Sequence, residues 1–171
     1  MMDAYLLRSL VRQCNYNQVQ AEWAHSYIEL VLMERSMSTP QRPDIRPMND
    51  QFKYLLSRYE ATFLPDIRIL DYCQEQEIRA MSTPHLKGLQ RILSLMLEHK
   101  PFPIVSVHDE FKCHANNMNW LRKHYRSIMA DIADSRVLDD LLSQVYGVPG
   151  TFPKKSPNLG DKIRQSNYAI C

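Results

Sequence analysis

Glycine is scarce in this sequence, with 4 glycines against 10 prolines in 171 residues. So few glycines exclude the glycine-rich phosphate-binding loops, whose tight turns need several of them at fixed spacing. Cysteine is also sparse, and the cysteines at positions 14, 73, 113 and 171 include no Cys-x-x-Cys pair. This spacing predicts free thiols in a reducing compartment and no disulfide framework.

The sequence also lacks any apolar run long enough to span a bilayer, and its first residues have no signal-peptide pattern. We therefore expect a protein of the cytoplasm. The formal net charge is only +2, so bulk charge does not point to nucleic acid. A hydrophobic content of 44% and a charged content of 23% are typical of one globular domain with its own core.

Most of the chain has the apolar spacing of amphipathic helices. Three prolines between residues 37 and 47 interrupt this pattern and predict an extended loop. The spacing gives no clear prediction for residues 67–72. We expect helices over residues 2–13, from Asn17 to the Pro-rich loop, from about 49 to 63, from 83 to about 99, from Asn116 to about 132, over 137–146, and from Asn158.

Several helix ends are also readable. Asn17 is expected to cap the second helix, and Gly147 to terminate the helix over residues 137–146. Thr83 is expected to cap a helix with Pro84 as its first residue, because proline costs nothing there. Asn158 and Asp161 together resemble a capping box for the last helix.

Residues 102–113 break the helical pattern. An apolar, β-branched run predicts a buried strand, and residues 111–113 predict a returning strand. His108, Asp109 and Glu110 would then form the turn between them. We therefore predict an α+β fold, mainly helical, with a small antiparallel hairpin at about residues 102–113. A carboxylate at the end of a rigid strand suits a metal ligand, and a polar turn without a ligand is the equal alternative.

Other chemistries are less well supported by the residues. Cys113-His114 near His108 lacks a second pair of zinc ligands, and a Cys113–His108 nucleophile pair lacks an orienting partner. Lys154-Lys155, with further cations downstream, could meet phosphate, although a solvated basic loop is the simpler interpretation. Composition and periodicity therefore predict a fold and an acidic hairpin, but no reaction.

The stretch Val107–Phe111, Val-His-Asp-Glu-Phe, resembles the third palm motif of the family A polymerase superfamily. This superfamily contains the single-subunit RNA polymerases of phages and mitochondria and the bacterial repair-type DNA polymerases. The two helices and the Pro- and Lys-bearing loop expected downstream fit the same order. Segments similar to phage RNA polymerases lie both before the motif, at Ser82–Lys87, and at the C-terminal foot, at Asn158–Ile163 and Ser166–Ala169.

The resemblance covers roughly residues 80–171, which it identifies as the C-terminal palm and foot part of a polymerase. Residues 1–79 remain an unassigned helical region with a Pro-rich loop. The implied function is DNA-directed RNA polymerisation by two-metal nucleotidyl transfer, with Mg²⁺ as the cofactor. Its implied partners are a DNA template, the RNA product and nucleoside triphosphates, in the cytoplasm of an infected bacterial cell.

The resemblance also assigns residues to roles. Asp109 would bind the catalytic Mg²⁺, and His108 at the turn would position that carboxylate and approach the primer strand. His85 would face the nucleotide or the primer terminus, and the Cys171 carboxylate would pack close to the active site. Glu110 stands where DNA polymerases of this group carry a carboxylate and phage RNA polymerases often carry serine.

Two elements of the superfamily are missing from residues 1–108: the second palm aspartate and the fingers helix with its cations. We therefore expect the chain to be inactive alone and to act with a second polypeptide that carries both. The chain would be either one subunit of a polymerase split over several genes or the C-terminal piece of an interrupted gene, and the initial Met1-Met2 favours the independently translated subunit. Two alternatives remain open: the C-terminal palm fragment of a family A DNA polymerase, favoured by Glu110, and a non-enzymatic helical interaction protein.

Overall fold

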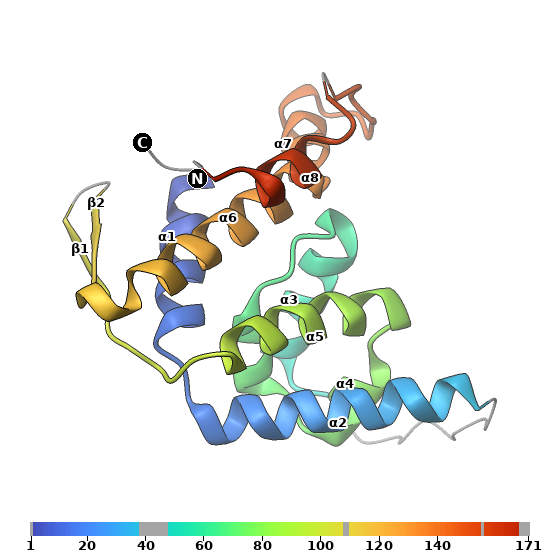
Figure 1. Cartoon of the computed structure of the whole chain (residues 1–171). Helices are drawn as coiled ribbons and strands as arrows, with labels where there is room; N and C mark the ends of the chain where they lie inside the picture. The colour runs from blue at the N-terminus through green and yellow to red at the C-terminus, as the bar shows by residue number, and fades with distance from the viewer. Residues whose placement is uncertain (1, 38–47, 108–109, 155, 168–171) are drawn as a thin grey trace.

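The computed structural model describes residues 2–37, 48–107, 110–154 and 156–167. Most of them are helical, and one two-stranded antiparallel sheet lies at the side of the molecule (Figure 1). The prediction of a mainly helical α+β fold with a small hairpin is confirmed. The elements are α1 (Met2–Cys14), α2 (Gln18–Ser36), α3 (Asp50–Thr62), the 3-10 helix η1 (Ile67–Tyr72), α4 (Glu75–Ala80), α5 (Thr83–Leu97), β1 (Val105–Val107), β2 (Glu110–Lys112), the 3-10 helix η2 (Ala115–Asn117), α6 (Met118–Asp134), α7 (Val137–Tyr146) and α8 (Leu159–Gln165).

Two predicted helix ends are confirmed. The Asn17 side chain accepts a hydrogen bond from the backbone N–H of Gln20 at 3.2 Å, which caps α2. Gly147 follows α7 with a φ of 68°, in the left-handed region where glycine has no steric penalty. Both ends depend on local chemistry, which is why the sequence alone predicts them.

Other ends differ from prediction. Ser82 is the cap of α5, so Thr83 is its first residue and Pro84 its second, one position later than expected. The predicted capping box at Asn158 is wrong, because the Asn158 side chain makes no capping hydrogen bond. Asp161 instead lies 3.3 Å from Arg164, which competes for its carboxylate. The short helix α4 was not predicted, and the Pro-rich stretch at 38–47 lies outside the described residues.

The larger hydrophobic cluster lies between α2, α3, η1, α4 and α5. The amphipathic stripe of α5 faces α2, which runs near the bottom of the molecule in Figure 1. Phe52 of α3 and Ile69 of η1 fill the space beside them, each almost wholly buried. Burial of an aromatic or branched side chain of this size contributes about 2 kcal/mol or more.

A second cluster joins α1, α6 and the hairpin. Leu10 and Cys14 of α1 pack with Leu121 and Ile128 of α6, and Phe102 closes the cluster from the segment after α5. Each cluster draws on residues from both sides of positions 79 and 80. The predicted division into residues 1–79 and 80–171 follows the resemblance and is not a division of the hydrophobic core.

The C-terminal helices are held by a buried carboxylate. Asp131 of α6 accepts hydrogen bonds from Arg91 of α5 at 2.6 Å and Arg164 of α8 at 3.2 Å. Its side chain is 6% exposed, so two cations compensate a carboxylate that is nearly out of water. Asp131 therefore links three helices. Within the described ranges, no helix combines the length and apolarity that a bilayer crossing needs.

Candidate functional site

The hairpin is the element that carries the sequence-predicted site. Its register pairs Val105 with Lys112, Ser106 with Phe111, and Val107 with Glu110. In the sequence, His108 and Asp109 stand between the last paired residues, Val107 and Glu110. Their own placement lies outside the described residues.

The hairpin packs on the second cluster through one face only. Successive side chains of a strand point to opposite faces, so Ile104 and Phe111 belong to the packed face. The Phe111 ring lies edge-on to Tyr125 of α6, with centroids 6.1 Å apart. This contact holds the strands against α6.

The opposite face of the hairpin is exposed. Val105 is 61% exposed and Val107 is 47% exposed, so the prediction of a buried strand is wrong for β1. β-branched composition indicates a strand, but burial depends on what packs against it. No described segment covers these two valines. Glu110 and Lys112 share their face because they are the register partners.

Glu110, at the start of β2, is a carboxylate of the predicted site that lies within the described residues. Its side chain is 66% exposed and pairs with Lys112 at 3.1 Å. Such exposed pairs contribute at most about 1 kcal/mol, so Lys112 is readily displaced. Among the described residues, no three His, Cys, Asp or Glu side chains converge as metal ligands. The described residues supply one carboxylate at this end of the hairpin, that of Glu110, and Asp109 lies outside them.

His85 lies in a different environment from the hairpin. Its ring is 6% exposed, and Nδ1 lies 2.6 Å from the Ser82 hydroxyl. Tyr59 of α3 and Phe63, which caps the C-terminal end of α3, flank the ring. Their ring centroids lie 4.5 and 5.2 Å from that of His85. Burial lowers the pKa of His85 from its ordinary value, which favours the neutral ring.

The length of α5 separates His85 from the hairpin. His85 lies in the first turn of α5, and about 18 Å of helix separate it from Leu97, after which the chain runs to β1. The structure thus brings His85 together with α3 and not with Glu110. Its assignment to the nucleotide site stays a prediction of the resemblance, as does that of Cys171, which lies outside the described residues.

The rival chemistries gain little from the structure. Burial raises the pKa of the half-buried Cys113 thiol, which disfavours the thiolate that a nucleophile or zinc ligand needs. Lys154 donates to the carbonyl groups of Ala133 and Ser135 at 2.7 and 2.8 Å, so its ammonium group serves the fold. Arg164 is likewise held by carboxylates, and Lys155 lies outside the described residues.

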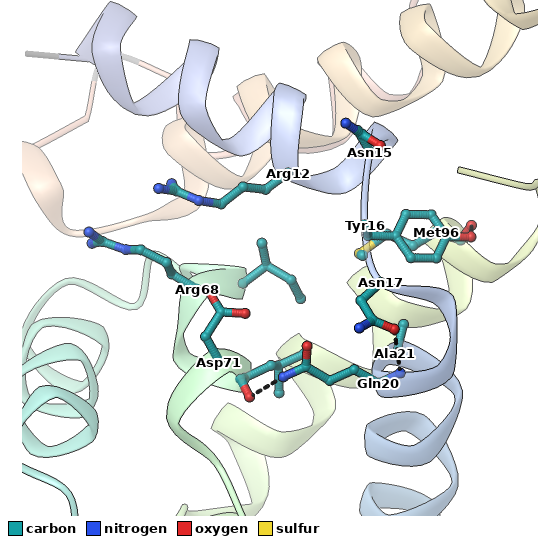
Figure 2. Close-up of a pocket in the computed structure, with 11 residues that line it drawn as sticks. Arg12, Asn15, Tyr16, Asn17, Gln20, Ala21, Arg68, Asp71 and Met96 are labelled. Atoms are coloured by element: carbon teal, nitrogen blue, oxygen red, sulfur yellow. Dashed lines mark hydrogen bonds between the residues drawn. The ribbon is translucent and has the colours of Figure 1, made fainter. Parts of the chain in front are cut away.

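A cleft that the sequence did not predict lies between α1, α3 and the residues leading into η1. It encloses about 340 Å³ and is lined by the side chains of Arg8, Arg12, Arg58 and Arg68. A smaller cavity of about 210 Å³ adjoins it and shares Arg12 and Arg68. Figure 2 shows these two arginines extending in the same direction, away from Tyr16 and Met96.

The sequence alone indicates only part of this cluster of four arginines. Arg8 and Arg12 are four residues apart, which places them on one face of α1. Nothing local indicates that Arg58 and Arg68 meet them, because that depends on how α3 and η1 pack. We name these four residues the arginine cleft. Comparison with known proteins adds no assignment: no protein-family model matches the sequence, and the search of curated proteins finds no significant match.

Proposed function

We propose that this chain is the C-terminal part of a phage-type DNA-directed RNA polymerase that acts together with a second polypeptide. The hairpin register supports the proposal: the antiparallel pairing of Val107 with Glu110 places the motif Val107–Phe111 at the end of a hairpin, as in the palm motif that it resembles. The order of a long helix, the hairpin and then α6 also fits the order that the resemblance implies.

Asp109 is the proposed metal ligand, together with a carboxylate of the second polypeptide. Bound Mg²⁺ would activate the attacking hydroxyl and offset charge on the transferred phosphate. His108 would orient the Asp109 carboxylate, and Glu110, once released from Lys112, would lie beside the same turn. The packing of Phe111 on Tyr125 supports this role, because a metal ligand must be held on a rigid element.

The exposed face of the hairpin is the proposed contact with the second polypeptide. A two-stranded sheet is marginally stable alone, and its outer edges and an apolar face are open to further strands. Val105 and Val107 would be covered when the palm sheet is completed. The proposed place of action is the cytoplasm of an infected bacterial cell.

The test is reconstitution. The purified chain is combined with a polypeptide that carries a fingers helix and a palm aspartate, sought first in the neighbouring reading frames, and RNA primer extension is measured on a DNA template. We expect no extension by either chain alone and Mg²⁺-dependent extension by the complex. Extension by this chain alone, or none by a stable complex, contradicts the proposal.

Glu110 favours a second candidate, the palm fragment of a family A DNA polymerase, because those enzymes carry a carboxylate at this position. The same assay separates the two when ribonucleotides and deoxyribonucleotides are supplied in turn. Use of ribonucleotides supports the RNA polymerase, and exclusive use of deoxyribonucleotides supports the DNA polymerase. A complex that uses neither supports the non-enzymatic interaction protein.

A further inference from the structure

We infer that the arginine cleft, Arg8, Arg12, Arg58 and Arg68, binds the phosphate backbone of a single-stranded nucleic acid. This inference goes beyond the proposed function, because Arg8, Arg12, Arg58 and Arg68 all lie in the region that the polymerase resemblance does not cover. It also concerns the chain by itself, without a second polypeptide. The cleft is formed by α1, α3 and the segment entering η1.

The cleft carries an excess of positive charge. Two of its arginines already have carboxylate partners: Arg58 pairs with Asp140 at 2.9 Å and Arg68 with Asp66 at 2.8 Å. Asp66 is the carboxylate in the cleft lining itself. Four guanidinium groups against these two carboxylates leave an excess of two positive charges, which attracts anions to the cleft.

Arg8 and Arg12 are the unusual members. Neither has a hydrogen-bond or ion-pair partner within the described part of the chain, although both line the cleft. They lie one turn apart on α1, where like charges at this spacing destabilise a helix. An anion between them would remove that repulsion. The fold thus presents two uncompensated guanidinium groups toward a space large enough for a ligand.

Phosphate is the anion that this arrangement fits best. The planar guanidinium fork binds two oxygens at once, and arginines at successive positions can follow successive phosphates. The volume of about 340 Å³ reaches the range of small-ligand sites, and the adjoining cavity continues past Arg12 and Arg68. A chain of phosphates could therefore extend from one cavity to the other.

An aromatic side chain at the cleft supports a nucleic acid over a free phosphate. Tyr54 of α3 lines the cleft and is 59% exposed. Exposed aromatic rings beside basic grooves act as stacking platforms for unpaired bases. We assign Tyr54 this role, with the arginines on the backbone and the ring on one base.

The test is a binding titration of the full chain alone. Fluorescence anisotropy follows a labelled oligo(dT) of about 12 nucleotides between about 50 and 200 mM salt. The double variant Arg8→Gln/Arg12→Gln is expected to bind at least about tenfold more weakly. Its slope of log K against log salt should fall by about 1.4, because each lost phosphate contact on a single strand removes about 0.7.

A matched control removes the same charge elsewhere. Lys87→Gln/Arg122→Gln changes two exposed cations of α5 and α6 that do not line the cleft, and it should bind like the wild type. Tyr54→Ala should weaken binding about fivefold or more, and Tyr54→Phe should restore it, because the phenyl ring still stacks. Melting temperatures of all variants verify that each is folded.

Four results would overturn the inference: no salt-sensitive binding by the wild type, equal losses in both double variants, competition by a nucleoside triphosphate as effective as by the oligonucleotide, or tighter binding of poly-glutamate. The third would assign the cleft to free nucleotides and the fourth to an acidic protein partner. The titration uses this chain alone and measures oligonucleotide binding, whereas the polymerase proposal is tested by nucleotide addition in the reconstituted complex. Failure here is thus distinguishable from failure of the polymerase proposal.

Discussion

The Nε2 atoms of His99 and His124 face one another at 2.7 Å, between the segment after α5 and the middle of α6. The Nδ1 atom of His124 lies 3.0 Å from Oε1 of Gln13 on α1, and that of His99 lies 2.8 Å from the Lys100 carbonyl. Carbonyl and amide oxygens only accept, so the Nδ1 atoms of both rings carry a hydrogen, and the contact between the two Nε2 atoms needs one more hydrogen on one of them. This chain of hydrogen bonds ties α1, the segment after α5 and α6 together.

The first prediction concerns pH. Burial, reinforced by the charges of His99 and Lys123, lowers the pKa of His124 to about 3. The unfolded chain therefore takes up a proton at His124 below about pH 6.5, whereas the folded chain does not until about pH 3. Stability is present in full above pH 6.5 and falls by up to about 1.4 kcal/mol per pH unit below it.

Urea unfolding at about pH 7 and pH 5 checks this effect. Across that range the wild type should lose about 2 kcal/mol more stability than His124→Gln does. His25→Gln, a change at a histidine that is only partly buried, serves as the control and should keep the wild-type dependence. An identical pH dependence in His124→Gln would show that His124 is not the group responsible.

The second prediction concerns Asp131. Asp131→Asn removes the charge that Arg91 and Arg164 share, and it should lower the free energy of unfolding by about 2 kcal/mol. The matched control is Asp50→Asn, which affects only an exposed pair with Lys53 and should cost less than about 0.5 kcal/mol. Denaturant titrations measure both, and equal losses would contradict the linking role of Asp131.

The third prediction concerns Gly160 of α8. A methyl group at this position would overlap the carboxylate of Asp134, which Arg164 holds at 2.7 Å. Gly160→Ala should therefore destabilise the protein by about 1 kcal/mol. At Gly150 the nearest atom to such a methyl is 3.7 Å away, on Phe152, so Gly150→Ala should be nearly neutral.

A double-mutant cycle identifies the cause of the Gly160 effect. In an Asp134→Ala background the overlap is gone, and Gly160→Ala should then be neutral or stabilising, because alanine favours helix over glycine by about 1 kcal/mol. If Gly160→Ala costs the same with and without the Asp134 carboxylate, the close approach of α8 to α6 is not its cause.

The fourth prediction concerns the exposed hairpin face. Val105→Thr/Val107→Thr should change the free energy of unfolding of the isolated chain by less than about 0.5 kcal/mol, because both side chains are largely in water. The same double variant should bind the second polypeptide at least about tenfold more weakly, since it loses two buried apolar side chains at the contact. Isothermal titration measures this, and unchanged affinity would remove the face from the interface.

Local features of the fold were readable from the sequence. Asn17 at a helix start and Gly147 at a helix end act through their own neighbours, so their residue types suffice. The hairpin was also readable, because the β-branched residues around Val105 contrast with the helices on both sides.

What the sequence could not provide depends on distant packing. His99 and His124 are 25 residues apart, and Gln13 is 111 residues from His124, so no local pattern indicates their contact. The burial of His85 depends on α3 covering it, and the exposure of Val105 depends on no described segment doing so. The arginine cleft has the same origin, since only Arg8 and Arg12 share a helix.

The most direct test of the central claim is the rate of nucleotide addition by the reconstituted complex with Asp109→Asn, at saturating Mg²⁺. We predict a loss of at least about 100-fold, equivalent to about 2.7 kcal/mol of transition-state stabilisation. Asp3→Asn, at an exposed carboxylate on α1, should retain the wild-type rate. A wild-type rate with Asp109→Asn would contradict the assignment of the hairpin turn as a metal ligand, and with it the polymerase function.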